Sequence, residues 1–424
     1  MSLLIDGFNL IYKFSELESL MYMDRLQDAR EGLLRILLSY QKIKKGNITV
    51  VFDGKKEPSR EIRSERVGGI DVYYSLDYSA DYLIITVPHL QSVAEQLASY
   101  RQGKGLKTMV VLQDDIMDEF NYGNYSPDAI RNFLIYAYNN WAKYPDYIVL
   151  AGEGNDDYKN YQGYGGNLIP PIMIGSPDGL FPSDNYFADI NDDHIPEIAI
   201  GRLPAGTSEE FQALVNKIIS YENSSGNNWK NTVILLADNP DIGGDFTADS
   251  NALASIIPQT YSIQKIYLSE NSAEDTKQML LSGINNGAVL LNYLGHASMD
   301  RLAQEGILTL DDISSLNNYE KLPVITALTC VLGNYSIAGF DSLGVAMLLK
   351  QNGGVSAVFS PTGMSLNSQA LDLGKSFYQA YFEKQGQTLG EIVLHALNKS
   401  KYDGVSGYII DIYNILGDPA LQLK

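Results

Sequence analysis

The stretch KLPVITALTC, residues 321–330, is a short run of mostly apolar and β-branched residues that ends in a thiol. A second stretch of similar character, GAVLLNYLGH at residues 287–296, ends in a histidine. Runs of this length and composition predict buried strands of a parallel sheet. In an open α/β sheet, ligands and chemistry gather beyond the carboxyl ends of the strands. The two stretches therefore predict that Cys330 and His296 lie at the functional edge of such a sheet.

A thiol and an imidazole at strand ends are what a cysteine peptidase requires, because the imidazole helps to ionise the thiol and the thiolate attacks a carbonyl. Cys330 is the only cysteine of the chain, and His296 is one of four histidines. The neighbours of His296, which are Gly295, Ala297 and Ser298, are small and let backbone approach a ligand closely. The alternative is that Cys330 is a small buried core residue, the usual role of a lone cysteine.

Composition limits the classes of function. The 424 residues, of which 45% are apolar, suit two or three domains with large cores. A net charge of −20 argues against nucleic acid or an anionic membrane as a partner. No run of about 18 apolar residues occurs, so no membrane span is expected. The N-terminus lacks the basic region and cleavage site of a signal peptide, which predicts either a cytoplasmic protein or a chain whose export signal has been lost.

Residues 1–76 predict a β-α-β-β segment. Its expected elements are a strand at 3–9, a helix at 25–45, and strands at 48–54 and 70–74. Acidic residues at the ends of parallel strands hold Mg²⁺ in metal-dependent nucleases. An Asp-Gly pair after a strand is also ordinary turn chemistry.

Three motifs give this segment a resemblance to the NYN/PIN-like RNA-nuclease domains: IDGFN at residues 5–9, VFDG at 51–54 and YSAD at 78–81. The resemblance ends near residue 85, before the remaining acidic motif of that family. It implies a truncated module without RNase activity, because the rest of the acidic cluster is missing around Asp6, Asn9, Asp53 and Asp81.

Beyond this segment, continuous apolar runs alternate with helical patterns, which predicts mostly parallel sheets covered by helices on both faces. The polar stretch NSSGNN, residues 223–228, is the best internal linker. It divides an expected first sheet at 77–222 from a second at 226–424.

Residues 80–424 resemble the catalytic domain of the gingipain family, cysteine peptidases of clan CD with two caspase-like subdomains. The matching motifs are DYLIIT (81–86), YIVLAGEG (147–154), SDNYFAD (183–189), IGRLP (200–204), NYLGH (292–296), ALTC (327–330) and LGDPAL (416–421). The resemblance implies a protein or peptide substrate, a usually secreted family, and His296 and Cys330 as the catalytic pair. Ala297 stands where the family usually has glycine.

The same resemblance suggests the supporting groups. The N–H groups of Ala297 and Cys330 would bind the oxyanion of the tetrahedral intermediate. A carboxylate should orient the imidazole of His296 as a third catalytic residue. The resemblance assigns this role to Asp238, which follows the apolar run TVILLA at 232–237 and corresponds to an acidic residue beside the family's histidine. The alternative for Asp238 is a helix cap or a turn.

Gingipains cut after basic residues by means of an acid in the specificity pocket, and Asp245 lies closest to that position. We therefore expect a preference for Arg or Lys before the cleaved bond, although Asp245 could equally be a solvated loop residue. An inactive caspase-like interaction module is the alternative function for the whole region.

A further acidic loop predicts a structural Ca²⁺ site. Its oxygen-bearing side chains, Asp189, Asn191, Asp193 and Glu197, stand at positions 1, 3, 5 and 9 of a tight loop. This spacing is how calcium loops gather hard ligands, although His194 replaces the usual glycine. The alternative is an acidic, solvated turn.

Overall fold

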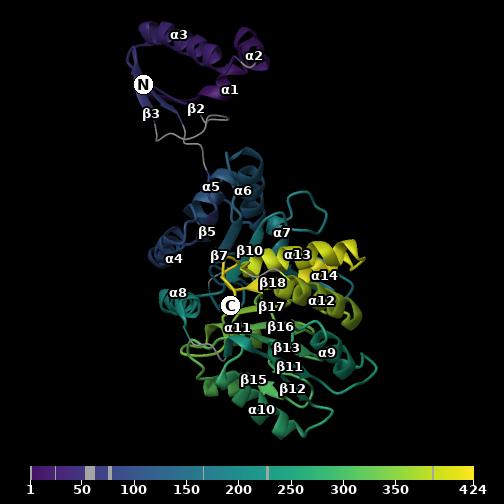
Figure 1. The fold of residues 1–424 in the computed structure, drawn as a ribbon. Helices are drawn as coiled ribbons and strands as arrows, with labels where there is room; N and C mark the ends of the chain where they lie inside the picture. Colours follow the sequence, from purple (N-terminus) through teal and green to yellow (C-terminus); the bar gives the residue numbers. More distant parts are fainter. Residues whose placement is uncertain are drawn as a thin grey trace. The chain divides into compact units, whose positions relative to one another are not determined.

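The computed structural model describes residues 2–23, 25–52, 63–74, 79–165, 167–225, 229–383 and 386–424 (Figure 1). The chain divides into two compact units. The first comprises residues 1–79 with 137–144, and the second comprises 80–136 with 145–424. Asp53 and Tyr78, which belong to two of the nuclease-like motifs, lie outside the described residues.

The first unit contains a small sheet in the order β1-β2-β4-β3. Its strands are β1 (Ser2–Asp6), β2 (Asn47–Phe52), β3 (Arg63–Val67) and β4 (Ile70–Tyr74), and its helices are α1 (Gly7–Ile11), α2 (Ser15–Tyr22) and α3 (Leu26–Lys44). β1, β2 and β4 are parallel, and β3 pairs antiparallel with β4. Apolar residues of α3 and the sheet share one core, which explains the helical spacing of the sequence.

The predicted β-α-β-β pattern is thus present, with two more helices and the strand β3. The predicted first strand was too long, because it ends at Asp6 and not at Asn9. The Asp6 carboxylate caps α1 by accepting the N–H of Asn9 at 2.9 Å. A capping Asp satisfies a helix N–H that has no partner within the helix, and it therefore begins a helix at this point.

The second unit is built on one sheet of ten strands, in the order β12-β11-β13-β16-β17-β18-β10-β7-β5-β6 (Figure 1). These strands are β5 (Tyr82–Thr86), β6 (Thr108–Leu112), β7 (Tyr147–Ala151), β10 (Ala199–Leu203), β11 (Thr232–Ala237), β12 (Ser262–Tyr267), β13 (Leu290–Leu294), β16 (Val324–Leu328), β17 (Ala357–Pro361) and β18 (Tyr413–Leu416). Neighbouring strands are parallel except β17 and β18.

Two separate sheets were expected, one at 77–222 and one at 226–424, and this expectation was wrong, because the C-terminal strand β18 joins the strands of both regions into one sheet. β18 pairs antiparallel with β17 and parallel with β10. Both expected subdomains therefore contribute strands to a single sheet, and the boundary between residues 222 and 226 stays a prediction. The strand β18 was not expected from the sequence, because YNIL at 413–416 is short and interrupted by an asparagine.

Helices cover this sheet, and most of its central strands are buried along their whole length. The helices are α4 (Gln91–Gly103), α5 (Gln113–Asn121), α6 (Pro127–Asn140), α7 (Asn185–Ala188), α8 (Ser208–Asn223), α9 (Phe246–Ala254), α10 (Ala273–Asn286), α11 (Leu343–Leu349), α12 (Asn367–Glu383), α13 (Leu389–Tyr402) and α14 (Gly407–Ile412). Two hairpin-like pairs, β8 (Ile172–Ser176) with β9 (Gly179–Ser183) and β14 (Arg301–Leu302) with β15 (Leu308–Thr309), lie outside the large sheet. Short 3-10 helices occupy Pro88–Leu90, Trp229–Asn231 and Leu310–Ser315.

Three of the motifs that resemble the gingipain family contribute residues to buried ion pairs. Arg202 of β10 is fully buried and bonds both carboxylate oxygens of Asp184 at 2.8 Å. Arg101 of α4 bonds Asp418, two residues after the end of β18, at 2.6 Å. A buried guanidinium needs such partners, since an unpaired charge there would cost several kcal/mol. The motifs IGRLP, SDNYFAD and LGDPAL therefore have structural roles.

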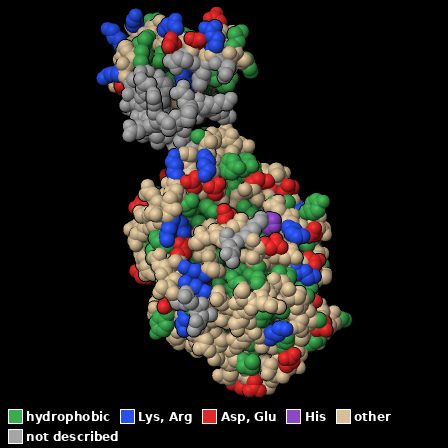
Figure 2. All heavy atoms as spheres, in the orientation of Figure 1, with side chains coloured by type: hydrophobic (Ala, Val, Ile, Leu, Met, Phe, Trp, Pro, Cys, Tyr) green, Lys and Arg blue, Asp and Glu red, His purple; other side chains and the backbone are tan. Residues whose placement is uncertain are grey.

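On the face shown in Figure 2, acidic and basic side chains are interspersed. Among the described residues, no helix is both long enough and apolar enough to cross a membrane.

Candidate active site

The histidine and the cysteine singled out from the sequence follow two neighbouring strands. β13 and β16 are parallel and adjacent, and Leu294 and Leu328 are paired in register at their ends. His296 and Cys330 each come two residues later. The structure therefore places the two residues at the same edge of the sheet, as the two apolar runs predicted.

The backbone that carries His296 is fixed by close contacts. Gly295 has a φ of +151°, and a Cβ at this position would lie 2.3 Å from the Cβ of Asp238. The hydroxyl of Thr329 donates to the carbonyl of Gly295 at 2.6 Å, and that of Tyr293 donates to the carbonyl of His296 at 2.6 Å. A glycine before the histidine is thus required by space and by backbone conformation.

The imidazole of His296 pairs with Asp241. Its Nε2 lies 2.9 Å from Oδ2 of Asp241, and both side chains are about half exposed. The pKa of Asp241 is lowered, first because its carboxylate accepts the N–H of Gly243 and then because it bonds His296. A negatively charged partner is therefore in place beside the ring at neutral pH.

Asp238, the acid expected to orient the ring, has a different contact. It is buried, and its Oδ2 accepts the backbone N–H of His296 at 3.1 Å. Burial raises the pKa of Asp238 above its usual value. The expectation of a bond from Asp238 to the ring was wrong for this structure, because the backbone N–H is the group that the end of β11 brings within reach of Asp238.

The thiol of Cys330 is half-buried. It lies between the N–H of Ser365, 3.4 Å from Sγ, and the carbonyl of Ser365, 3.7 Å from Sγ. Burial raises the pKa of the thiol. Val331, the next residue, has a φ of +46°, which is rare and strained for a β-branched residue. The chain therefore makes a sharp turn directly after the thiol.

Ala297, the expected oxyanion donor, sits in a short bridge with Leu302. The flanking residues make the hydrogen bonds of this bridge, from Ser298 N–H to Arg301 and from Ala303 N–H to His296. In such a non-hydrogen-bonded pair, the N–H of Ala297 is directed away from the partner strand. This geometry suits a donor that serves a bound substrate.

A cavity of about 670 Å³ adjoins the histidine. Its lining residues are Asp238, Asn239, Asp241, His296, Ala297, Ser298, Arg301, Ala303, Gln304 and Glu305. Three carboxylates and one guanidinium are among them, so the charged lining is mainly acidic. Asp245 is not among the lining residues; its Oδ1 instead caps α9 by accepting the N–H of Ala248 at 2.9 Å.

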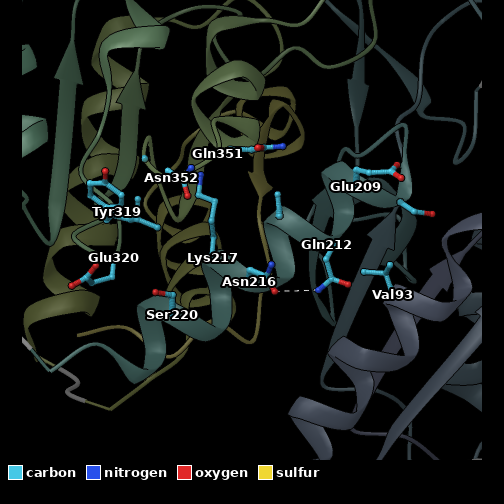
Figure 3. A pocket seen from close by; sticks show the side chains of 14 residues that line it. Val93, Glu209, Gln212, Asn216, Lys217, Ser220, Tyr319, Glu320, Gln351 and Asn352 are labelled. Carbon is cyan, nitrogen blue, oxygen red and sulfur yellow. Dashed lines mark hydrogen bonds between the residues drawn. The ribbon is translucent and has the colours of Figure 1, made fainter.

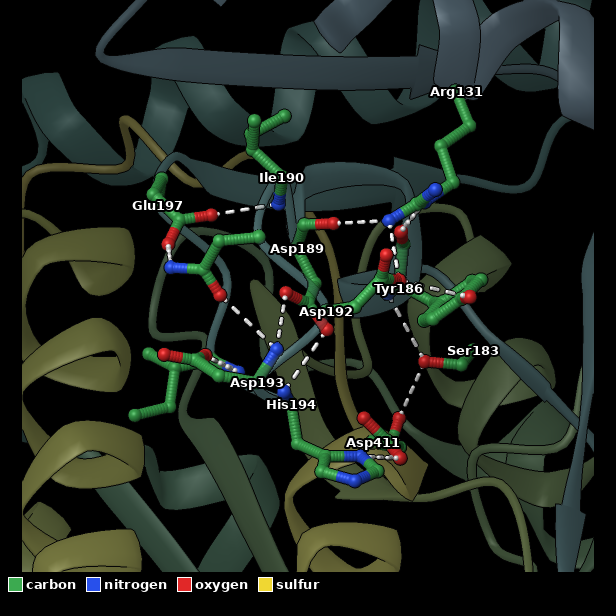
Figure 4. A network of polar contacts seen from close by, with 12 residues as sticks. Arg131, Ser183, Tyr186, Asp189, Ile190, Asp192, Asp193, His194, Glu197 and Asp411 are labelled. Carbon is green, nitrogen blue, oxygen red and sulfur yellow. Dashed lines mark hydrogen bonds and ion pairs between the residues drawn. The ribbon is translucent and has the colours of Figure 1, made fainter.

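The acidic loop expected to bind Ca²⁺ uses its oxygens internally (Figure 4). The buried carboxylate of Asp189 accepts the N–H groups of Asp193 and His194 at 3.1 and 3.0 Å. Glu197 accepts the N–H of Ile190 at 2.7 Å and the amide of Asn191 at 2.6 Å. Within the described residues, no group of three or more acidic, histidine or cysteine side chains is arranged to hold a metal ion. In this conformation the loop does not fit a cation.

A second cavity, of about 700 Å³, lies beside α8 and is lined by neither His296 nor Cys330 (Figure 3). Lys217 of α8 reaches toward Asn352 there (Figure 3), and its ammonium donates to the carbonyls of Leu348 and Lys350 at 2.7 and 3.2 Å. Burial lowers the pKa of Lys217 to about 7. The amine ties α8 to the end of α11.

Two partners of the candidate site were missed by the sequence analysis. Asp241 was visible only as one of several aspartates in the loop after β11, and its position two residues before the glycine pair 243–244 was the available signal. Ser365 lies 35 residues from Cys330 and gives no signal in the sequence.

Comparison with known proteins identifies the family of the chain. Residues 75–424 match peptidase family C25. The chain belongs to peptidase family C25. Residues 3–97 also match the YacP-like NYN domain, in agreement with the resemblance of the first unit.

Curated relatives of this C25 chain include gingipain R2 of Porphyromonas gingivalis, which is 21% identical over an alignment of 361 residues and is matched with coverage of 81% of this chain and 46% of the relative. Lys-gingipain W83 of the same organism is 24% identical over 162 residues, which cover 36% of the chain and 9% of the relative. The chain spans less than half the length of these curated relatives.

Among solved structures, the C25 chain is similar to the Arg-specific cysteine proteinase gingipain R (RgpB), with a TM-score of 0.69, 19% identity and coverage of 82% of this chain and 79% of that chain. The complex of the RgpB pro- and mature domains from Porphyromonas gingivalis gives a TM-score of 0.68 at 19% identity, covering 81% and 79%. At this identity the likeness establishes the fold, which is the caspase-like α/β fold expected for residues 80–424.

Proposed function

We propose that the chain is a cysteine endopeptidase in which Cys330 is the nucleophile and His296 the acid and base. The observation that carries this proposal is the position of the two residues, each two places beyond the aligned ends of β13 and β16. Membership of peptidase family C25 supports the same chemistry and a protein or peptide substrate.

The proposed reaction follows from these groups. His296 takes the proton of the Cys330 thiol, and the thiolate attacks the peptide carbonyl to give a tetrahedral intermediate. The N–H groups of Ala297 and Cys330 hold its oxyanion, and loss of one such donor typically costs about 3 kcal/mol. His296 then protonates the leaving amine, and a water molecule, deprotonated by His296, hydrolyses the thioester.

The test uses the full chain and a mixed peptide library. Cys330→Ala and His296→Ala are each expected to abolish hydrolysis while the melting temperature stays close to that of the parent, because both residues lie beyond their strands. Retention of more than a small residual activity in either variant would overturn the assignment.

We also propose that a basic residue is preferred before the cleaved bond, with Asp245 as the recognising acid. Two facts support the preference for a basic residue: the acidic lining of the cavity beside His296, to which Asp245 does not contribute, and the likeness of the fold to that of an Arg-specific cysteine proteinase. A charged pocket discriminates strongly because a neutral side chain would leave its carboxylate unpaired.

A structural Ca²⁺ ion held by Asp189, Asn191, Asp193 and Glu197 is a further proposal. Its basis is the spacing of the four side chains. Ligation would require these side chains to release the N–H groups that they now accept, so we propose a weak site.

The second candidate function is an inactive caspase-like interaction module. The observation that favours it is the resting thiol, whose pKa is raised by burial and not lowered. The rate at which Cys330 is alkylated, measured with and without a substrate-like peptide aldehyde, separates the two functions. A peptidase is protected by the aldehyde, whereas an interaction module is alkylated at an unchanged rate.

A further inference from the structure

We infer that Asp241, and not Asp238, is the carboxylate that orients the imidazole of His296, with the ring proton on Nε2 and the Nδ1 lone pair left to exchange a proton with Cys330. This inference rests on the proposed peptidase function. It gives the two neighbouring acids different roles: Asp238 positions the backbone of His296, and Asp241 positions its ring.

The carboxylate of Asp241 is held from two sides. Its Oδ2 lies 2.9 Å from Nε2 of His296, and its Oδ1 accepts the N–H of Gly243 at 2.7 Å. The backbone of Asp241 exchanges two hydrogen bonds with that of Gly244, from N–H to carbonyl at 3.0 Å and in return at 3.3 Å. The tight turn at 241–244 therefore fixes both the position and the direction of this carboxylate.

Asp238 is already occupied by other donors. Its Oδ2 accepts the backbone N–H of His296 at 3.1 Å, and its Oδ1 accepts the N–H of Asn239 at 2.7 Å. The hydroxyl of Tyr293 lies 3.4 Å from the same Oδ2. These contacts set where the end of β13 lies, and they leave the rotation of the imidazole to another group.

The turn also limits how the ring can rotate. A Cβ added to Gly243 would lie 3.1 Å from Cε1 and 3.2 Å from Nε2 of His296, which is tighter than ordinary contact. The ring of Phe246 packs edge-on, with its centroid 5.3 Å from that of the imidazole. Phe246 and the turn that contains Gly243 and Asp241 therefore constrain the plane of the ring.

This arrangement selects one tautomer. A neutral imidazole has one N–H and one lone pair, and the carboxylate at Nε2 favours the N–H at that nitrogen. The thiol proton of Cys330 then passes to Nδ1, and the resulting imidazolium is stabilised by Asp241, which gains no proton. Nδ1–H later donates this proton to the leaving amine. The charged groups that line the adjoining cavity, besides Asp241, are Asp238, Glu305 and Arg301.

The experiment compares Asp241→Asn with Asp238→Asn, which remove the same charge with little change of shape. In full-length protein labelled with ¹⁵N at histidine, the ring signals of His296, assigned with His296→Ala, report the tautomer without any need for activity. We expect an Nε2–H imidazole in the parent and in Asp238→Asn, and its loss in Asp241→Asn. On peptides, Asp241→Asn should lower kcat by about a hundredfold or more with KM little changed, since the wrong tautomer is catalytically incompetent.

Each outcome has a definite meaning. If Asp238→Asn loses the Nε2–H signature and Asp241→Asn keeps it, the inference is wrong and Asp238 is the orienting acid. An active parent whose kcat survives Asp241→Asn would also overturn it. A parent that shows the expected signatures but hydrolyses no peptide would refute the proposed function and leave the pairing of ring and carboxylate in place.

Discussion

The backbone of Ser365 brackets the thiol of Cys330, with its N–H 3.4 Å and its carbonyl 3.7 Å from Sγ. Ser365 follows β17, the strand next to β16, so the thiol lies between the ends of two adjacent strands. The N–H of Ser365 favours a thiolate, whereas its carbonyl and the burial of the site favour the protonated thiol. Burial has the larger effect, and the pKa of the thiol is therefore raised. The thiol is therefore neutral at rest, and in the proposed mechanism His296 removes its proton.

Val331 is expected to carry backbone strain in this turn. At a φ of +46°, an L-residue with a branched Cβ is disfavoured by about 1–2 kcal/mol relative to glycine. Val331→Gly and Val331→Ala both remove the branched side chain, but only glycine relieves the strain. We expect the free energy of unfolding of Val331→Gly to exceed that of Val331→Ala by about 1 kcal/mol, as measured by equilibrium denaturation in urea.

Elsewhere in a chain glycine is the less stable of the two, because it loses more entropy on folding. The order of the two variants is therefore decisive. An alanine variant as stable as the glycine variant would mean that residue 331 carries no strain.

Asp411 is expected to make stability fall as pH rises through weakly acidic values. Its carboxylate in α14 is buried beside His194, with 2.7 Å between Oδ2 and Nδ1, and burial raises its pKa from 3.8 to about 6. The Asp411 carboxyl binds its proton more tightly in the folded state than in the unfolded state. Its contribution to the free energy of unfolding is therefore complete below pH 3.8 and is lost as pH rises to about 6. The change amounts to roughly 3 kcal/mol at most.

Asp411→Asn removes this titration and keeps the size of the side chain. The free energy of unfolding, measured at a series of pH values between about 4 and 7, should fall less steeply with rising pH in the variant than in the parent. Identical slopes would show that Asp411 does not titrate in this range.

The positions of His296 and Cys330 could be predicted from the sequence because a buried parallel strand is a continuous apolar run, and the first polar residues after it lie at the sheet edge. The pairing of the ring with Asp241 could not, since it depends on the turn at 241–244 packing against the end of a different strand. Likewise, the contacts of Ser365 with the thiol of Cys330 could not be predicted, because Ser365 follows a third strand, β17. The two halves of the large sheet are joined by β18, and a strand of four residues is too short to show a pattern from which it could be predicted.

The first unit is expected to lack RNase activity and to be dispensable for peptide hydrolysis. The carboxylate of Asp6 is engaged by the N–H and the side-chain amide of Asn9, at 2.9 and 2.6 Å. In the second unit, Asp81 accepts the N–H of Lys107 at 2.6 Å. Removal of residues 1–76 should leave kcat/KM on peptides unchanged. Cleavage of RNA by the full chain with Mg²⁺ or Mn²⁺, lost in Asp6→Asn, would contradict this expectation.

Calcium is expected to raise the melting temperature by a small amount and only at millimolar concentration. An ion that binds the native state stabilises it by mass action, but here it must displace the N–H groups bound to Asp189 and Glu197. The measurement is a thermal melt of chelator-treated protein with and without Ca²⁺, with Mg²⁺ as the control. A melting temperature that Ca²⁺ does not change removes the site.

Asp245 allows a sharp test of specificity, because its two possible roles respond differently to the same substitution. As the N-cap of α9 it accepts the N–H of Ala248 at 2.9 Å, and asparagine caps a helix about as well as aspartate. As a recognition group for Arg or Lys it needs its negative charge. Asp245→Asn should therefore keep the melting temperature and lower kcat/KM for substrates with Arg or Lys before the cleaved bond by about a hundredfold or more, with little change for neutral residues.

Asp249 provides the matched control, since it is the next acid along the same helix and accepts the amide of Asn367 at 2.8 Å. Asp249→Asn removes an equal charge a turn further from the cap. If Asp245→Asn leaves the preference for basic residues intact while Asp249→Asn abolishes it, the recognising acid is Asp249. If the parent cleaves as well after apolar or acidic residues, neither carboxylate determines specificity, and the capping bond to Ala248 accounts for Asp245 by itself.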